Sequence, residues 1–440
     1  MKHLMSLSFL WMVLVSVPVL AGQLTLDQAF DQALDANPTV QAMVQRINQA
    51  KEGVSQARAA YLPQLDVSVG ASRKQISRNE DAVSAGLKRT TDYYDGFLSG
   101  KWVLFSGFSR RFNLEAARLG QDFETASQAD LIRKLLASVA ASFHTAQLAL
   151  ANHYIADANR EFYTSQLKTA RLKQQAGVGS YSDVLNFNTR MNQARIEMER
   201  YQAESDVARA ALAALLGDDA LGSDLPDPIF PKEEIPMEME IPDPKERIAH
   251  AMDNRPDLAG LQLSYKIAQV NAEAARSKFY PELSLNGSVG ADRSGSGRFE
   301  SHDIENSVGL ALSYPLYAGG KDRSALRQAL YAGAEAELEL RNLKNEVSSQ
   351  VRQDCFTVTA AQKQLRLYRE NFKLVKENRD MVATEYQAGQ TSQINLNEVQ
   401  NNLSETQQRI ALSLISLRQA WYELKASSGS IYTQSQTNID

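Results

Sequence analysis

The sequence has few of the residues that form disulfide frameworks, metal centres or nucleic-acid surfaces. Its 440 residues include one cysteine, Cys355, so the chain cannot form an internal disulfide. The five histidines stand at no metal-ligand spacing with cysteine or with one another. The formal net charge of −5 argues against nucleic acid, because proteins that bind it usually carry a basic patch. We therefore expect no metal, no cofactor and no nucleic-acid partner.

Signatures of catalysis are missing as well. The sequence has no Gly-x-Ser-x-Gly nucleophile turn and no phosphate-binding Gly-Lys-Ser/Thr loop. Ser294-Gly295-Ser296-Gly297 is typical of a loop tip, because no helix pattern follows it. Cys355 falls within a predicted helix, where it is expected to pack against neighbours rather than to act as a nucleophile. The sequence therefore predicts no catalytic residue and does not favour an enzyme.

Long apolar runs are confined to the N-terminus. Lys2, an apolar stretch over residues 4–15 and Val19-Leu20-Ala21 match a secretory signal that is cleaved after residue 21. A membrane anchor is the alternative, but the stretch is short for a transmembrane helix. No later run of 18 apolar residues exists, so no transmembrane helix is predicted. We expect residues 1–21 to be a signal peptide.

Proline is absent from two long stretches, residues 64–225 and 316–440. Six of the 12 prolines cluster within residues 217–245, which we interpret as a linker. Because proline breaks helices and sheet ladders, its absence elsewhere permits very long helices on both sides of this linker.

The halves on either side of the linker repeat one another. In each half two prolines stand 25 residues apart, at positions 38 and 63 and again at 256 and 281. Three glycines follow in each half at equal spacings of 70 and then 40 residues: Gly107, Gly177 and Gly217, and Gly319, Gly389 and Gly429. Only the stretch from second proline to first glycine differs, with 44 residues against 38, which one loop insertion explains. We therefore predict structural repeats over residues 22–216 and 246–429, followed by a tail over 430–440.

Each repeat predicts the same series of elements. A helix of about 25 residues fills the space between the two prolines, and two strands follow it. Residues 108–176 and 320–388 contain no proline and predict helices of roughly 67 residues, about 100 Å long. Each long helix turns near its second glycine and returns for roughly 35 residues. Apolar side chains at seven-residue intervals favour coiled-coil-like packing along a narrow seam, as in Leu396, Leu403, Ile410, Leu417 and Leu424.

The strands alternate apolar and polar side chains, which predicts one apolar face. In the first strand Leu65, Val67 and Val69 share a face. The second strands carry the rows Leu98, Gly100, Trp102 and Leu104, and Leu310, Leu312, Tyr314 and Leu316. Three aromatic residues, Tyr93, Tyr94 and Phe97, are expected just before the first of these second strands. Their position is compatible with a girdle of aromatic side chains at a membrane interface. A half-buried strand of a soluble sheet fits the alternation equally well, so the long helices decide the interpretation.

Four strands per chain cannot close a membrane barrel, because open sheet edges are not tolerated in lipid. Two chains would supply eight strands around a filled interior, whereas three chains supply 12 and leave room for a lumen. The narrow helical seams also require neighbours from other chains. The predicted fold is therefore mainly α with a small β part. In it, a long coiled-coil-like α-helical barrel is continued by a membrane β-barrel, 12-stranded in a trimer.

Short segments spread over nearly all of the mature chain carry a resemblance to a known family. They are Leu24-Thr25-Leu26-Asp27-Gln28-Ala29-Phe30 with Asn37-Pro38, Asn254-Arg255-Pro256-Asp257-Leu258, Ala274-Ala275-Arg276, Phe279-Tyr280-Pro281-Glu282-Leu283 and Tyr317-Ala318-Gly319-Gly320. In this order and duplicated, they resemble the TolC-type outer membrane efflux proteins. The resemblance implies a homotrimer in the lipid of a Gram-negative outer membrane, extending into the periplasm. It also implies a periplasmic adaptor and an inner-membrane ABC or proton-driven transporter, for type I secretion or drug efflux.

The resemblance further implies that the two hairpin turns form a periplasmic mouth and contact the adaptor. The turn residues are Gly177, Gly179, Ser180, Gly389, Thr391 and Ser392. Asp183 matches an aspartate, and Tyr386 a tyrosine, that pair in the family and help to hold the mouth closed. The pore constriction, which has two aspartates in the best-studied members, has Asn395 and Glu398 here. One carboxylate per chain remains, so we expect weaker cation binding at this constriction.

A periplasmic coiled-coil scaffold or adaptor without a membrane barrel is the serious alternative. It would share the signal peptide and the helices but would not need four amphipathic strands. Extraction only with detergent, as a heat-modifiable trimer, favours the duct, whereas a freely soluble periplasmic protein favours the scaffold.

Overall fold

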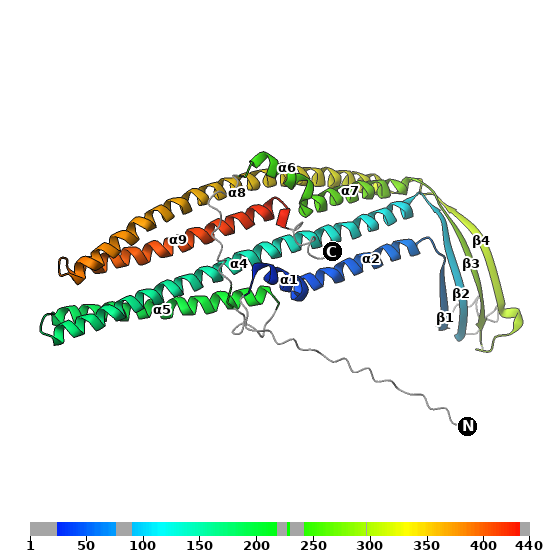
Figure 1. The fold of residues 1–440 in the computed structure, drawn as a ribbon. Coiled ribbons are helices and arrows are strands. Elements are labelled where there is room, and N and C mark those ends of the chain that lie inside the picture. The colour runs from blue at the N-terminus through cyan, green and yellow to red at the C-terminus, as the bar shows by residue number, and fades with distance from the viewer. Residues whose placement is uncertain (1–23, 76–89, 218–226, 229–241, 296, 432–440) are drawn as a thin grey trace, which may run out of the picture. The chain divides into compact units, whose positions relative to one another are not determined.

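The computed structural model describes residues 24–75, 90–217, 227–228, 242–295 and 297–431. The predicted signal peptide and most of the predicted linker 217–245 and tail 430–440 lie outside these residues. Within the described residues the chain is mainly helical and forms a four-stranded sheet (Figure 1), as the sequence predicts.

One order of elements occurs twice along the chain (Figure 1). The first series is α1 (Leu26–Ala36), α2 (Pro38–Ala59), β1 (Gln64–Gln75), β2 (Thr90–Ser106), α4 (Ser109–Gln175) and α5 (Tyr181–Leu215). The second series is α6 (Pro244–Asn254), α7 (Pro256–Arg276), β3 (Glu282–Ser294), β4 (Ile304–Ser313), α8 (Lys321–Gln387) and α9 (Gln393–Ser427). Two short 3-10 helices, Ser277–Phe279 and Ser301–Asp303, flank β3.

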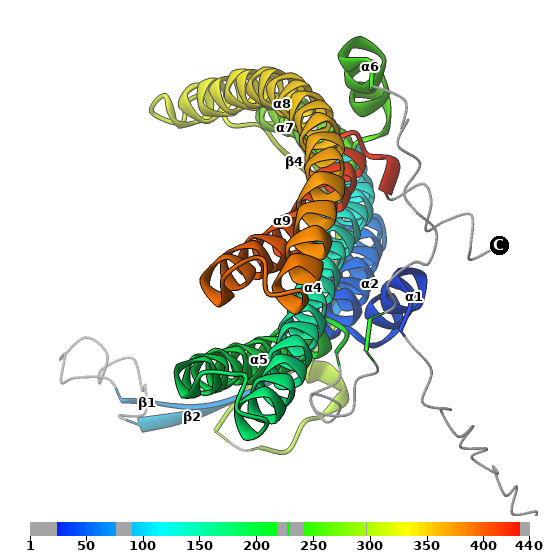
Figure 2. The ribbon, with the colours of Figure 1, turned by 60° about the vertical axis from the view of Figure 1, so that its left-hand side comes forward.

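The long helices and their returns have the predicted lengths. α4 and α8 contain 67 residues each, and α5 and α9 contain 35 each. Figure 2 shows α5 beside α4 and α9 beside α8, so that each pair forms a hairpin. None of the helices in the described ranges is apolar over enough of its length to cross a membrane.

Two short helices, α1 and α6, are not among the predicted elements. Each has 11 residues, too few for hydrophobic periodicity to reveal it, and each depends instead on its N-terminal cap. In α1, Thr25 and Gln28 form a reciprocal capping box. In α6, Asp243 caps the first turn and Pro244 occupies its start, so the helix begins inside the predicted linker.

The sheet is antiparallel throughout and has the order β1-β2-β3-β4. The sequence analysis expects Tyr93, Tyr94 and Phe97 just before the second strand. This expectation is wrong, because β2 begins at Thr90 and all three residues lie within it. A register shift between Val103 and Phe105 leaves Leu104 without a partner on β3. This bulge interrupts the predicted alternation, which periodicity alone does not reveal.

The end of β4 also differs from the prediction. The strand ends at Ser313, so Tyr314 and Leu316 lie beyond it and do not share a face with Leu310 and Leu312. Pro315 explains the difference, because proline has no N–H to donate to the ladder.

The chain divides into two compact units, which are described separately. Unit 1 comprises Met1–Asn37, Ala137–Glu240 and Thr359–Tyr422, and it contains α1, α5 and both hairpin turns. Unit 2 comprises Pro38–Leu136, Ile241–Val358 and Glu423–Asp440, and it contains the sheet, α2, α6 and α7.

The predicted seam along α9 is present. Four members of the seven-residue row are buried, namely Leu396, Leu403, Leu417 and Leu424, and Ile410 is half-buried. The corresponding row on α8 includes the buried side chains of Val351, Val358 and Leu365. The rest of α8 is largely exposed, as expected for a helix that packs along a narrow stripe, whereas most residues of α9 are buried or half-buried.

Candidate functional site: the tips of the helical hairpins

The two hairpin turns have the same backbone geometry. Gly177 and Gly389 adopt left-handed φ angles of 76° and 75°, which residues with a Cβ rarely tolerate. In each turn this glycine donates to the carbonyl three residues earlier, and the next residue donates to the carbonyl five residues earlier. This is the Schellman pattern, which ends a helix by satisfying its last carbonyls. The long helices therefore stop where the predicted glycines stand.

Polar side chains start the two return helices. Ser180 accepts a hydrogen bond from the backbone N–H of Ser182 at the start of α5. Ser392 accepts one from the N–H of Asn395 at the start of α9. These hydroxyls satisfy N–H groups that have no partner within the helix.

An apolar cluster joins the two hairpins in unit 1 near the turns. Its buried members come from all four helices: Tyr163, Leu167, Ala170, Phe187, Ala194, Val382, Leu396 and Val399. Phe187 is fully buried at its centre, and Tyr386 packs against the cluster. Because burial of a large apolar side chain stabilises by about 1.5–3 kcal/mol, the cluster stabilises the contact between the hairpins.

The structure brings the two predicted gate residues near one another without a hydrogen bond between them among the described residues. The Tyr386 ring meets Phe187 edge-to-face, with 6.1 Å between the ring centroids. The Lys173 ammonium lies 5.3 Å from the centroid of the same ring, within the range of a cation–π contact. Burial raises the pKa of the Tyr386 phenol, and the negative charge of Asp183 raises it further. The pairing of Asp183 with Tyr386 remains a prediction.

The two residues predicted for the constriction lie on α9. The Asn395 side chain donates to the hydroxyl oxygen of Thr391 at 3.0 Å, which ties the first turn of α9 to the hairpin turn just before it. Glu398 stands one turn further along and is exposed. Their position at a pore constriction remains a prediction, because it depends on neighbouring copies of the chain.

The sequence analysis does not single out Gln393, the first residue of α9. Its side chain is 7% exposed, and its Nε2 donates to the carbonyl oxygen of Asp183 at 3.1 Å. Its Oε1 accepts a longer hydrogen bond, 3.5 Å, from the side chain of Asn186. The sequence signal for Gln393 is its position three residues before Leu396, the first leucine of the seam. Residues three apart lie on the same side of a helix, so Gln393 is placed on the side that packs.

A model of the outer membrane efflux protein family matches residues 29–218 and 248–430 of the chain. The chain belongs to this family. The alkaline protease secretion protein AprF of Pseudomonas aeruginosa is 29% identical over 343 residues, which cover 76% of this chain and 69% of AprF. The outer membrane protein TolC of Vibrio cholerae is 22% identical over 411 residues, 90% of each chain.

Solved structures show the same fold. A membrane protein from Pseudomonas aeruginosa matches with a TM-score of 0.79 and 19% identity, over 92% of this chain and 93% of that protein. The outer membrane protein VceC of Vibrio cholerae matches with a TM-score of 0.77 and 17% identity, over 92% of this chain and 96% of VceC.

Membership in the family gives this chain its general role and place. It is an outer membrane channel of the efflux and secretion class, and it extends into the periplasm. Channels of this family are homotrimers that work with periplasmic adaptors and inner-membrane transporters. The family is one of transport proteins rather than of enzymes.

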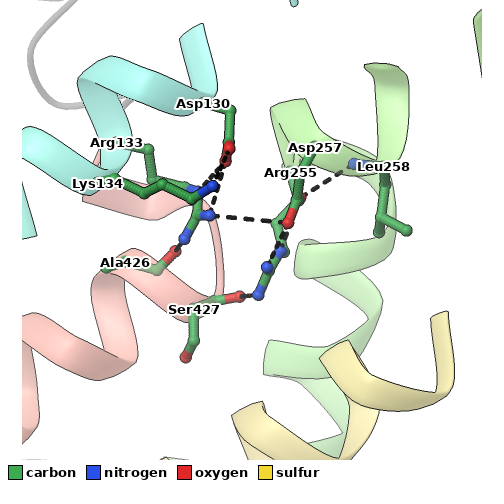
Figure 3. A network of polar contacts seen from close by, with 8 residues as sticks. All are labelled: Asp130, Arg133, Lys134, Arg255, Asp257, Leu258, Ala426 and Ser427. Carbon is green, nitrogen blue, oxygen red and sulfur yellow. Dashed lines mark hydrogen bonds and ion pairs between the residues drawn. The ribbon is translucent and has the colours of Figure 1, made fainter. Parts of the chain in front are cut away.

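In this outer membrane efflux protein, a polar network in unit 2 holds the C-terminal end of α9 (Figure 3). Arg133 on α4 donates to the carbonyl oxygen of Ala426 at 3.1 Å. Arg255, between α6 and α7, donates to the carbonyl oxygen of Ser427 at 2.9 Å. The last carbonyls of a helix lack partners within it and carry partial negative charge, so cations stabilise this end.

Both arginines are buried beside carboxylates. Arg133 pairs with Asp130 at 2.6 Å, and Arg255 pairs with Asp257 at 2.5 Å. Arg133 also lies 3.7 Å from Asp257, which links the two pairs (Figure 3). Burial alone would raise the pKa of Asp257, but Arg255 and then Arg133 hold it below its usual value. Because each charge is paired and hydrogen-bonded, the network tolerates its burial.

The first repeat uses the equivalent positions with a neutral side chain. In unit 1, the side chain of Asn37 donates to the carbonyl oxygen of Leu215 at 2.9 Å. Asn37 and Arg255 each precede the first proline of their repeat, and Leu215 and Ser427 each stand two residues before its last glycine. In both return helices, the last carbonyl thus accepts a hydrogen bond from a side chain near the start of the same repeat.

Proposed function

We propose that three copies of this chain form one outer-membrane duct. A periplasmic adaptor and an inner-membrane ABC or proton-driven transporter would pass cargo through it, in type I secretion or drug efflux. The names of the relatives include both classes, since AprF is an alkaline protease secretion protein and BepC of Brucella suis an outer membrane efflux protein. The chain itself would catalyse no reaction and hold no cofactor.

The observation that carries the proposal is the pair of open, apolar sheet edges. β1 and β4 are each paired on one side only among the described strands. Leu65, Val67 and Val69 on β1, and Val308, Leu310 and Leu312 on β4, are all at least 68% exposed. Open edges with apolar rows are costly in water and in lipid alike. Pairing β1 of one copy with β4 of the next removes both edges, and three copies supply the 12 strands of a barrel with a lumen.

The helices of unit 1 support the same assembly. α4 lies against α9, where Gln400 donates to Asn159 at 3.0 Å and Tyr163 donates to Asn401 at 3.1 Å. The outward sides of the other two helices carry exposed apolar rows. These rows are Leu185, Ile196 and Val207 on α5, and Leu367, Leu374 and Met381 on α8. We propose that α5 of one copy packs against α8 of the next, which buries both rows.

At the periplasmic end we propose a mouth built from the hairpin tips. Asp183 and Tyr386 would help to keep it closed, and Asn395 and Glu398 would line its constriction. The turns would contact the adaptor through the residues predicted from the resemblance: Gly177, Gly179, Ser180, Gly389, Thr391 and Ser392. The cluster that joins both hairpins next to these residues supports the assignment, since a gate needs elements that pack in a closed state.

We also propose the division of the chain that the sequence predicts. Residues 1–21 would be the cleaved signal, residues 22–216 and 246–429 the two repeats, 217–245 the linker and 430–440 the tail. The parallel element order of the two series supports the repeat boundaries.

A planar lipid bilayer tests the proposed function. Purified protein is expected to insert and to give discrete conductance steps, because a closed barrel with a lumen conducts ions. A periplasmic scaffold or adaptor without a barrel would give none. Absence of conductance steps from protein that is folded and assembled by circular dichroism and gel filtration would contradict the proposed function.

A further inference from the structure

Gln393 stands at the start of α9, is 7% exposed and makes polar contacts from the tip of the second hairpin to the tip of the first. Its carboxamide uses both ends across the hairpins, because Nε2 donates to the backbone of Asp183 and Oε1 accepts from Asn186. Both partners belong to α5, in the first hairpin, whereas Gln393 begins α9, in the second. A buried amide whose partners move away is left unsatisfied, so separation of the tips is opposed at this point.

The neighbouring residues of α9 do not make such a connection. Asn395 donates to Thr391, and Ser392 accepts from the N–H of Asn395, so all three are engaged with one another where the turn meets α9. Thr391 and Asn395 both carry neutral side chains, and these are bonded to each other. Among these residues at the start of α9, Gln393 therefore makes the polar connection to α5.

The second connection is aromatic and lies beside the first. Tyr386 of the second hairpin is held between Phe187 and the ammonium of Lys173, both of the first hairpin. These ring contacts hold the two hairpins together but restrict little the direction in which one helix can shift along the other. The hydrogen bonds of Gln393 are directional and add that restriction.

We propose that Gln393 is the polar latch of the mouth in this chain. While its carboxamide bridges α9 and α5, the second hairpin cannot swing away from the first within the same protomer. Opening breaks the bridge in every copy and exposes the carboxamide to water. The inference rests on the proposed function and identifies a residue that regulates the same mouth.

Two variants of Gln393 and one matched control test the latch in bilayer recordings. Gln393→Leu keeps the size of the side chain but removes both hydrogen bonds, and Gln393→Glu keeps the length but removes the donor. Each is expected to raise the closed-state conductance about fivefold, the factor that corresponds to one ordinary hydrogen bond. Gln407→Leu is the control, because Gln407 stands two heptads along the same face of α9, is half-buried and makes no hydrogen bond among the described residues.

Asn186→Ala provides a second approach if Gln393→Leu does not assemble. Asn186 is exposed, so its removal is tolerated by the fold and takes only the weaker half of the bridge away. We expect about a twofold rise in closed-state conductance.

The outcomes separate the latch from the proposed function. Wild-type protein that forms no channel contradicts the proposed function. A conducting wild type whose Gln393→Leu and Gln393→Glu variants conduct like it, or an equal rise in Gln407→Leu, overturns the latch and leaves the proposed function in place.

Discussion

At the scale of single residues, mostly neutral side chains make the contacts at the tips of the two helical hairpins. Thr391 and Asn395 bond to each other, Gln393 bridges the hairpins, and Tyr386 packs against Phe187. The pairing of Asp183 with Tyr386 comes from the family resemblance and remains a prediction. The sequence analysis does not single out Gln393, because its spacing to Leu396 indicates only that it lies on the seam side of α9, and many other glutamines on these helices are exposed.

Glu398 is the one carboxylate that remains at the predicted constriction. If three copies bring it to a narrow axis, its field concentrates cations there. We expect Glu398→Ala to reduce the reversal potential of the reconstituted channel in a tenfold KCl gradient by about half. The control is Glu405→Ala, which removes the same charge from an exposed glutamate seven residues along α9.

Glu405 is paired with Arg409 at 2.6 Å, so its loss is expected to change ion selectivity little. Equal reversal potentials for wild type and Glu398→Ala would show that Glu398 is an ordinary solvated residue of the helix surface.

At the scale of elements, the glycines and prolines of the sequence determine the helix lengths closely. Left-handed glycines end both long helices, and the absence of proline lets them run for 67 residues. The limits of the strands were less predictable. A bulge near Leu104 and the stop before Pro315 depend on pairing with β3, which alternation does not encode. α1 and α6 depend on caps rather than on periodicity.

Arg255 can be used to test whether a side chain from the start of a repeat stabilises the C-terminal end of the return helix. Arg255→Asn gives the second repeat the side chain of the first, but it leaves Asp257 buried with Arg133 as its remaining cation at 3.7 Å. Breaking a buried pair in this way costs about 3–5 kcal/mol. We expect the midpoint of thermal unfolding to fall by several degrees, measured by circular dichroism in detergent.

Two further variants make this measurement specific. Arg276→Ala removes an exposed pair with Glu273 on α7, which is worth at most about 1 kcal/mol, and is expected to change the midpoint little. Arg255→Asn combined with Asp257→Asn removes the uncompensated charge and is expected to recover part of the loss. A midpoint for Arg255→Asn that matches Arg276→Ala would show that the network does not hold α9.

At the scale of the whole molecule, one chain is incomplete in two independent ways. The sheet has two edges with apolar rows, and the helices of unit 1 carry apolar rows on α5 and α8. The strand count of four could be read from the sequence, and it already required partners. Which helix faces remain uncovered could not, because that depends on how the hairpins pack, with α4 against α9.

Counting the copies in the particle extracted from the membrane tests the central claim most directly. The outer-membrane fraction is solubilised in detergent, and the intact complex is weighed by native mass spectrometry. The account predicts three copies of the mature chain per particle and almost none of the protein in the soluble periplasmic fraction. A monomer that is freely soluble in the periplasm would contradict it.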